Sequence, residues 1–157
     1  MDEHPVELVF ESLRQEVEEI LAQTPHLVLA TTADNRVTAR TMSHVNIGLG
    51  VYFQTGKGST KYAQISAHPR VALCLGNLQI EGEAEILGHP LAEANRAFRE
   101  LYREKHPSSY ERYSHREDEV VIRVRPILCT LWKYVDGRPG REFLDLEAGR
   151  AFREDYR

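Results

Sequence analysis

The first part of the chain places apolar residues three and four positions apart, with Glu and Arg between them. These apolar residues are Val6, Val9, Phe10, Leu13, Val17, Ile20 and Leu21. This spacing gathers them on one side of a helix, so it predicts an amphipathic helix over residues 5–23. Pro5 suits a first helical position, and Thr24-Pro25 ends the helix.

After residue 25 the pattern changes to short, apolar and often β-branched runs, which predict strands. The predicted strands are 26–32, 37–44, 51–55, 71–75, 78–87, 120–124 and 127–135, with Pro126 separating the last two. In the second run, period-two alternation puts Thr38, Arg40, Met42 and His44 on one face, and Val37, Ala39, Thr41 and Ser43 on the other.

Two further helices interrupt the strands. Ser59 is a good N-cap for a short helix over 59–67, which His68-Pro69 ends. A second helix over 90–105 is followed by residues 107–118, which read as a loop or a helical turn. The pattern of residues 136–157 predicts no element. Because strands mostly follow one another through tight turns, we expect a mainly β fold: an antiparallel sheet closed into a barrel, with helices outside.

Composition narrows the class of protein. At 157 residues the chain, residues 1–157, is expected to form a single domain, and 41% hydrophobic with 28% charged residues is typical of a globular protein. A net charge of -4 argues against a nucleic-acid partner. The acidic N-terminal part and the lack of a ~20-residue apolar run predict no signal peptide and no membrane span, hence a cytoplasmic protein. Cys74 and Cys129 are expected to be reduced and buried.

The first candidate site is the turn Gly56-Lys57-Gly58 followed by Ser59-Thr60-Lys61. A helix start offers free N–H groups and a positive dipole end, hydroxyls add donors, and lysines add charge, so the turn suits a phosphate. The alternative is that Ser59 only caps a helix and the lysines are solvated. A Walker-type loop is rejected, because one residue, not four, separates the two glycines.

Arg40 is the second candidate. An arginine on a strand can be an exposed edge charge, but neighbouring antiparallel strands would let Arg40 and Lys61 converge on one anion, and arginine suits bidentate phosphate contact.

Several segments resemble the pyridoxamine 5'-phosphate oxidase-like family of FMN-binding split barrels. They are residues 37–42 (VTARTM), 51–55 (VYFQT), 58–65 (GSTKYAQI), 68–73 (HPRVAL), 80–84 (IEGEA), and Arg125-Pro126 with the strand ending in Leu131-Trp132. The resemblance covers roughly residues 20–135. It implies a split β-barrel of six or seven antiparallel strands with flanking helices.

The resemblance also implies FMN as cofactor, bound at the interface of a homodimer. Its phosphate would be held by Arg40, Ser59 and Lys61, with Thr60 and Gln64 in the same motif. The isoalloxazine and ribityl portions would be lined by Thr41, Met42, Tyr52, Phe53, Gln54 and Thr55. Asn77 would reach the flavin from the second subunit. Trp132 would contact the ring, or else close the barrel.

One departure from the family concerns the substrate. True pyridoxamine phosphate oxidases carry a C-terminal Arg-x-His-Asp segment after the tryptophan, but this chain has Lys133 to Arg141 there and no histidine after His115. We therefore do not expect pyridoxamine phosphate oxidation. The sequence assigns no catalytic residue. No metal site is predicted, because the histidines lack ligand spacing and His68, His89 and His106 precede prolines.

Three functions stay open: an FMN-dependent oxidoreductase of a small molecule, a flavin- or haem-binding protein without turnover, and an F420-dependent reductase. Haem would need an axial ligand, for which His44 is the candidate. F420 would need extra basic residues along a groove, which a chain of net charge -4 does not suggest.

Overall fold

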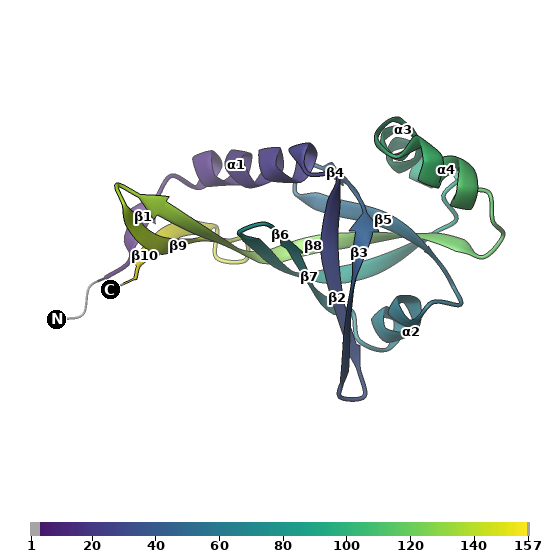
Figure 1. Cartoon of the computed structure of the whole chain (residues 1–157), viewed down its shortest axis with the longest axis horizontal. Helices are drawn as coiled ribbons and strands as arrows, with labels where there is room; N and C mark the ends of the chain where they lie inside the picture. Colours follow the sequence, from purple (N-terminus) through teal and green to yellow (C-terminus); the bar gives the residue numbers. More distant parts are fainter. Residues whose placement is uncertain (1–3, 157) are drawn as a thin grey trace.

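A computed structural model describes residues 4–156 of the chain; residues 1–3 and 157 of the expected domain lie outside the described residues. Over this part the chain forms one ten-stranded sheet with four α-helices and a short 3-10 helix (Figure 1). The elements are β1 (Val6–Leu8), α1 (Phe10–Gln23), β2 (His26–Ala33), β3 (Arg36–Ser43), β4 (Val45–Ile47), β5 (Gly50–Gly56), α2 (Thr60–Ala67), β6 (Arg70–Leu75), β7 (Leu78–Gly88), the 3-10 helix (Glu93–Asn95), α3 (Arg96–Lys105), α4 (Pro107–Tyr113), β8 (Glu119–Val135), β9 (Arg138–Asp145) and β10 (Arg150–Asp155).

The sheet runs in the order β1-β10-β9-β8-β7-β6-β2-β3, with β5 pairing β8 and β4 off this path. Each strand pairing is antiparallel. The predicted mainly β class with helices outside is confirmed. The described sheet does not close through hydrogen bonds, because β1 and β3 lie at the two ends of the path.

The 17-residue strand β8 organises this sheet. Along one edge it pairs with β7. Along its other edge, residues 119–124 pair with β5, and residues 128–135 pair with β9. The sheet therefore forks along β8, with β5 on one branch and the C-terminal strands on the other.

The predicted break at Pro126 is wrong, because β8 runs straight through it. Pro126 lies in the gap between the β5 and β9 ladders, so its missing N–H interrupts neither of them. On the opposite edge it faces Gly82 at a bulge of β7. A Cβ on Gly82 would lie 2.7 Å from Val124 Cγ1 and 2.8 Å from the Arg125 carbonyl oxygen, so the close approach of the strands requires glycine.

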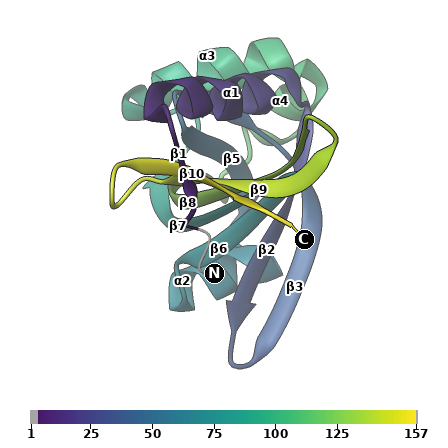
Figure 2. The same cartoon turned by 90° about the vertical axis from the view of Figure 1, so that its left-hand side faces the viewer.

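Helices cover the sheet unequally. Helices α1, α3 and α4 lie on one side, and α2 lies at the opposite end of the view (Figure 2). Leu13, Val17 and Leu21, four residues apart on α1, are buried in the main core with strands β2, β5, β6, β7 and β8. A smaller core of Val45, Phe98, Tyr102 and Val121 joins α3 to the sheet.

The N-terminal helix begins five residues later than predicted. Residues Val6–Leu8 pair with β10 as β1, so Pro5 does not start a helix and Val6 and Val9 stay 60% and 69% exposed. Sequence periodicity cannot detect a strand whose partner lies at the far end of the chain. The helix predicted over 90–105 likewise begins only at Arg96, after the 3-10 helix, and residues 107–113 are helical.

Cys74 is exposed, which contradicts the prediction, whereas Cys129 is buried as expected. On β6 the residues Val71, Leu73 and Leu75 point into the core, so Cys74 falls on the outer face. There it pairs with Val28 of β2, which is itself 39% exposed. Within residues 4–156 no helix is long and apolar enough to cross a lipid bilayer.

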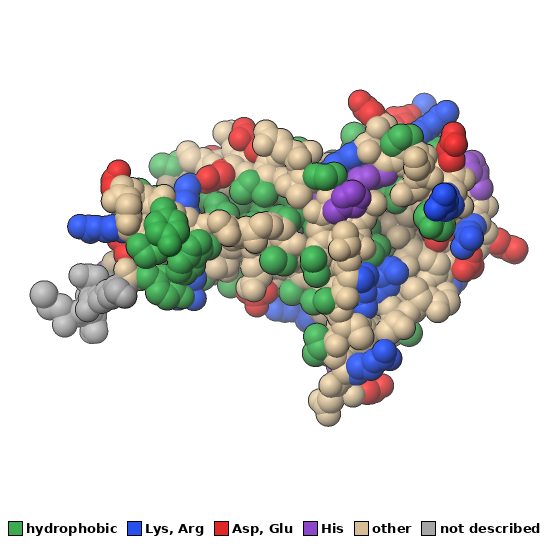
Figure 3. Space-filling view, in the orientation of Figure 1, with side chains coloured by type: hydrophobic (Ala, Val, Ile, Leu, Met, Phe, Trp, Pro, Cys, Tyr) green, Lys and Arg blue, Asp and Glu red, His purple; other side chains and the backbone are tan. Residues whose placement is uncertain are grey.

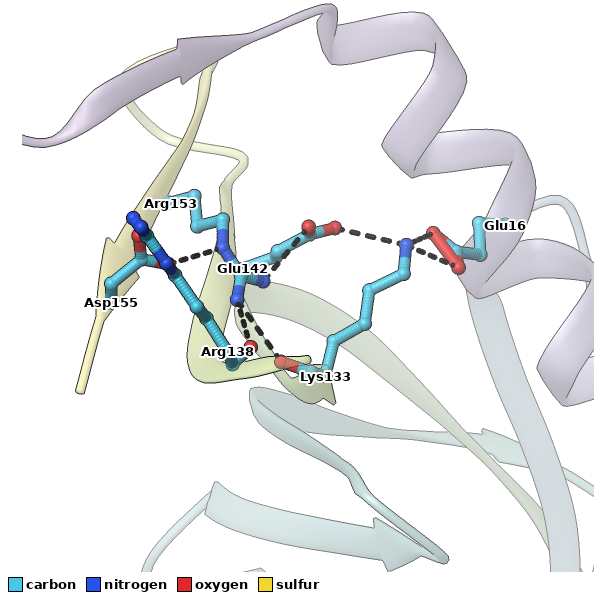
Figure 4. Close-up of polar contacts among 6 residues, drawn as sticks. All are labelled: Glu16, Lys133, Arg138, Glu142, Arg153 and Asp155. Atoms are coloured by element: carbon cyan, nitrogen blue, oxygen red, sulfur yellow. Dashed lines mark hydrogen bonds and ion pairs between the residues drawn. The ribbon is translucent and has the colours of Figure 1, made fainter. Parts of the chain in front are cut away.

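Residues 136–157, for which the sequence predicted no element, contain β9 and β10 within their described part. Buried charges tie them to the rest of the molecule (Figure 4). Arg153 Nη1 lies 3.3 Å from Glu142 Oε2, and both side chains are 8% exposed. Lys133 Nζ lies 3.2 Å from Glu142 and 2.7 Å from Glu16 of α1. Arg153 Nη2 also donates to the carbonyls of Lys133 and Arg138, at 3.2 and 3.0 Å.

Replacing Arg153 should therefore destabilise the protein. Arg153→Met leaves Glu142 buried with one cation fewer, and we expect the free energy of unfolding to fall by about 2 to 4 kcal/mol in urea titrations. Arg150→Met is the matched control, because its ion pair with Glu7 is 50% and 61% exposed. It should cost at most about 1 kcal/mol. Equal losses in the two variants would contradict a structural role for the buried pair.

Candidate functional site

A cavity of about 300 Å³ opens where β3, β5 and the start of β8 meet helices α2, α3 and α4. Its lining residues are Thr41, Met42, Ser43, Gln54, Thr55, Gly56, Ser59, Lys61, Tyr102, Ser109, Tyr113, Arg116 and Glu119. Seen from outside, Lys and Arg side chains gather beside the β2–β3 hairpin, below helices α3 and α4 (Figure 3). Most of the lining residues have polar side chains, and several of these are hydroxyls, which suits a ligand that forms many hydrogen bonds.

One end of the cavity is the start of α2. Ser59 caps this helix: its Oγ accepts a hydrogen bond from the N–H of Tyr62 at 3.2 Å, and lies 3.0 Å from Thr55 Oγ1. The turn before it closes through the Ser59 N–H, which donates to the Gly56 carbonyl at 3.1 Å. The cap predicted at Ser59 is therefore confirmed. Thr60 is exposed, while Ser59 and Lys61 are partly buried in the cavity wall.

Arg40 and Lys61 lie near each other, as the sequence predicts. Burial lowers the pKa of both side chains, and the positive charge of Arg40 lowers the pKa of Lys61 further. Arg40 donates to Thr31 Oγ1 at 2.8 Å, to Thr38 Oγ1 and to the Leu29 carbonyl at 3.3 Å, and it is not among the residues that line the cavity. Across residues 4–156, neither cation forms an ion pair with a carboxylate. Two partly buried positive charges with no carboxylate in ion-pair contact favour binding of an anion.

Gln64 holds this arrangement together from the protein side. Its Oε1 accepts from Thr31 Oγ1 at 2.5 Å and from Thr38 Oγ1 at 2.6 Å, and its Nε2 donates to the Arg36 carbonyl at 3.1 Å. The amide oxygen and one amide N–H are thus used in fixing α2 to the β2–β3 hairpin. Its contribution to a bound ligand would be indirect, through the position of Arg40.

The residues expected to line the flavin divide into two groups. Thr41, Met42, Gln54 and Thr55 line the cavity. Phe53 is fully buried in the main core, and Tyr52 packs against Phe98 of α3, with ring centroids 6.4 Å apart. In a strand, alternate side chains point to opposite faces, so 52–55 cannot all face one ligand except through the backbone.

Asn77 and Trp132 lie together, but far from the cavity. The Trp132 N–H donates to the Asn77 carbonyl at 3.0 Å, and the Trp132 ring packs on Tyr156 with centroids 4.7 Å apart. Glu119, in the cavity wall, begins β8, and Trp132 lies near its other end, roughly 40 Å along the strand at about 3.3 Å per residue. Within one chain the structure does not bring this pair to the site.

The sequence did not predict the part of the cavity wall that comes from α3, α4 and the segment just before β8. Tyr102 lies within the helix predicted over 90–105, and Ser109, Tyr113 and Arg116 fall within residues 107–118, where no motif was found. Burial raises the pKa of Tyr102 to about 12. Burial also raises the pKa of Glu119, and the neighbouring charge of Asp118 adds to this. Only the density of tyrosine and serine over 102–114 could have indicated a site.

His44, the candidate axial ligand for haem, does not line the cavity. It is fully buried behind β3, where its Nε2 lies 3.0 Å from the Leu21 carbonyl and 3.5 Å from Lys105 Nζ. Its Nδ1 has no hydrogen-bond partner in the described structure. Burial lowers the pKa of His44 to about 4, with smaller contributions from Lys105 and His106.

The model of the pyridoxamine 5'-phosphate oxidase family matches residues 13–133. The chain therefore belongs to the pyridoxamine 5'-phosphate oxidase family. No curated protein matches the sequence.

Solved structures share the fold at low identity. General Stress Protein 26 from Bacillus anthracis is 22% identical with a TM-score of 0.64, over 85% of this chain and 98% of that one. A pyridoxamine 5'-phosphate oxidase-related, FMN binding protein from Nostoc punctiforme is 12% identical with a TM-score of 0.60, over 94% of each chain. A heme binding protein from Mycobacterium smegmatis is 19% identical with a TM-score of 0.71, over 90% of this chain and 61% of that one.

Buried His44 should make stability depend on pH. Its folded pKa, about 4, lies below the unfolded value of 6.5, so the unfolded state binds more protons between these values. Stability should be fully present above pH 6.5 and fall as the pH drops toward 4. Urea titrations from about pH 7.5 to about pH 4.5 should show that the wild type loses about 2 kcal/mol more than His44→Gln. The exposed His68→Gln should behave as the wild type, and a wild-type loss no larger than that of His44→Gln would refute the assignment.

Proposed function

We propose that this chain binds FMN in the cavity and uses it as the redox group of an oxidoreductase acting on a small molecule. The observation that carries the proposal is the pair of partly buried cations, Arg40 and Lys61, beside the capped start of α2. A phosphate monoester there would supply the missing negative charge and accept hydrogen bonds from Ser59 and the helix start. The Nostoc relative, described as FMN binding, has the same fold.

When bound, FMN supplies hydride or electron transfer through its ring. The residues of this chain bind and orient it: Arg40 and Lys61 attract the phosphate, Ser59 and Thr55 offer hydroxyls, and Met42 provides an apolar wall. Pyridoxamine phosphate oxidation is not part of the proposal. The stretch that would carry its Arg-x-His-Asp segment forms the end of β8, a turn at Asp136-Gly137 and the start of β9.

The proposal includes a homodimer, in which each flavin lies between two subunits. Two observations support it. The outer face of β2, β3 and β6 is uncovered by any described helix and exposes apolar side chains, with Val28 39% and Val37 71% exposed. Trp132, near the end of β8, and Asn77, in the turn before β7, lie too far from their own cavity to reach it, so the flavin contacts that the resemblance implies for them would have to come from a second copy related by a two-fold axis.

We further propose a reducing, cytoplasmic compartment, because Cys74 and Cys129 are free thiols. Haem is the alternative cofactor, favoured by the fold shared with the Mycobacterium protein. The visible spectrum of the purified protein decides between them. Flavin bands with release of FMN support the proposal, a Soret band supports haem, and a colourless protein that takes up no FMN overturns it.

Removing both cations should abolish FMN retention. For Arg40→Ala combined with Lys61→Ala we expect FMN affinity to fall about a hundredfold or more, because two charge-assisted contacts to phosphate are lost. Riboflavin, which lacks the phosphate, should bind the variant and the wild type alike. The exposed Lys57→Ala is the control from the same turn. Quenching of flavin fluorescence gives the affinities, and circular dichroism checks the fold; unchanged FMN affinity would show that the phosphate site lies elsewhere.

A further inference from the structure

Glu119 is the buried carboxyl group of the cavity. It is 5% exposed and stands at the first position of β8, where it pairs with Gly56 of β5. Gly56 lies three residues before the Ser59 cap, so Glu119 lies at the phosphate end of the cavity rather than at its far end. Lys61 is close enough for the two opposite charges to shift each other's pKa.

Gln54 holds this carboxyl group in one orientation. The Gln54 amide Nε2 donates to Glu119 Oε2 at 3.0 Å, and Gln54 Oε1 accepts from Ser114 Oγ at 2.9 Å. All three side chains are buried. Both ends of the Gln54 side chain are therefore occupied by the protein, although the family resemblance made it a cofactor contact.

The second carboxyl oxygen of Glu119 has no such partner. Among the described residues, Oε1 accepts no hydrogen bond, and it lies 3.7 Å from the position of a Cβ built on Gly56, which is itself part of the cavity wall. The charged groups around it are Lys61 from α2 and Arg116 and Asp118 from the segment before β8, while Tyr102 and Tyr113 come from α3 and α4. In this part of the wall Oε1 is an acceptor without a hydrogen-bond partner, with the cations Lys61 and Arg116 and the carboxylate of Asp118 around it.

We propose that Glu119 Oε1 accepts a hydrogen bond from a hydroxyl of the polyol chain of the bound cofactor, and that Gln54 acts as its positioning residue. This inference rests on the proposed function. In FMN the group joined directly to the phosphate is the ribityl polyol, which brings hydroxyl donors beside the Ser59 and Lys61 end. A carboxylate accepting from a hydroxyl forms a charge-assisted bond, stronger than a bond between neutral groups.

The variant Glu119→Gln tests this sharply. Gln54 Nε2 needs an acceptor, so the new side chain would turn its oxygen to Gln54 and leave its NH₂ facing the cavity. The shape of the wall is kept, while the cavity-facing atom changes from a charged acceptor to a neutral donor. The exposed Glu117→Gln is the matched control for the loss of one negative charge.

Three flavins separate the possible roles. FMN carries phosphate and polyol, riboflavin carries the polyol alone, and lumiflavin carries neither. We expect Glu119→Gln to weaken FMN and riboflavin about tenfold and to leave lumiflavin within about twofold of the wild type. Gln54→Met, which removes the positioning contacts, should show the same selectivity, and the double variant should lose little more than either single variant.

Each other outcome counts against the inference. Tighter binding of FMN alone would mean that Glu119 repels the phosphate, and an equal loss for lumiflavin would place Glu119 against the ring or make its role structural. Equal affinities of variant and wild type for all three flavins would overturn the inference alone. A wild-type protein that binds no flavin would overturn the proposed function and this inference with it.

Discussion

Strand β8 must pair with three partners at once, and the remaining structure follows from this requirement. One edge is occupied by β7 over most of its length, while the other is shared between β5 and β9. The β5 branch carries the cavity residues and leads into α2, and the β9 branch carries the C-terminal strands. The junction of the branches falls at residues 125–127, where a proline is tolerated because no strand pairs with it on that edge. Gly82 opposite must be glycine for the two strands to pass there.

Most of the sheet could be predicted from local patterns, because β2, β3, β5, β6 and β7 show alternation or apolar runs bounded by turn residues. The wrong predictions concern elements whose pairing partners lie far away in the sequence. Val6–Leu8 continues a helical pattern but pairs with β10. Residues 138–155 look charged because ion pairs join β9 and β10 on both faces, Arg141 with Glu154 on one and Arg153 with Glu142 on the other. Pro126 is a strand breaker by local rules and stands in mid-strand only because of the fork.

The candidate site, like the sheet, could be predicted from the sequence only in part. Arg40 lies on β3, and Ser59 and Lys61 lie at the start of α2, with β4 and β5 between them in the chain. Strands β3 and β5 do not pair, so strand order alone does not explain why these residues converge. Their partner Gln64 could be found as part of the motif, but its three hydrogen bonds to the β2–β3 hairpin could not. The wall from α3 and α4 arises because Phe98 and Tyr102 pack on Val45 and Val121, a tertiary contact without a sequence signature. The register of β7 and β8 places Asn77 and Trp132 beside each other, far from the cavity of their own chain. Whether they contribute to a cofactor site therefore depends on whether a second subunit binds.

The pairing of β1 with β10 also decides how the molecule responds to mechanical load. Val6 is paired with Arg153 and Leu8 with Ala151, so the outer end of this ladder lies where the two ends of the described chain emerge side by side (Figure 1). Antiparallel hydrogen bonds lie perpendicular to the strands, and tension between residues 4 and 156 acts along those bonds. The ladder would then open one bond at a time, as in unzipping, rather than by shearing all its bonds together. β1 would detach first under force, while the cavity, at the other end of β8, would stay intact until the strands of the fork were reached.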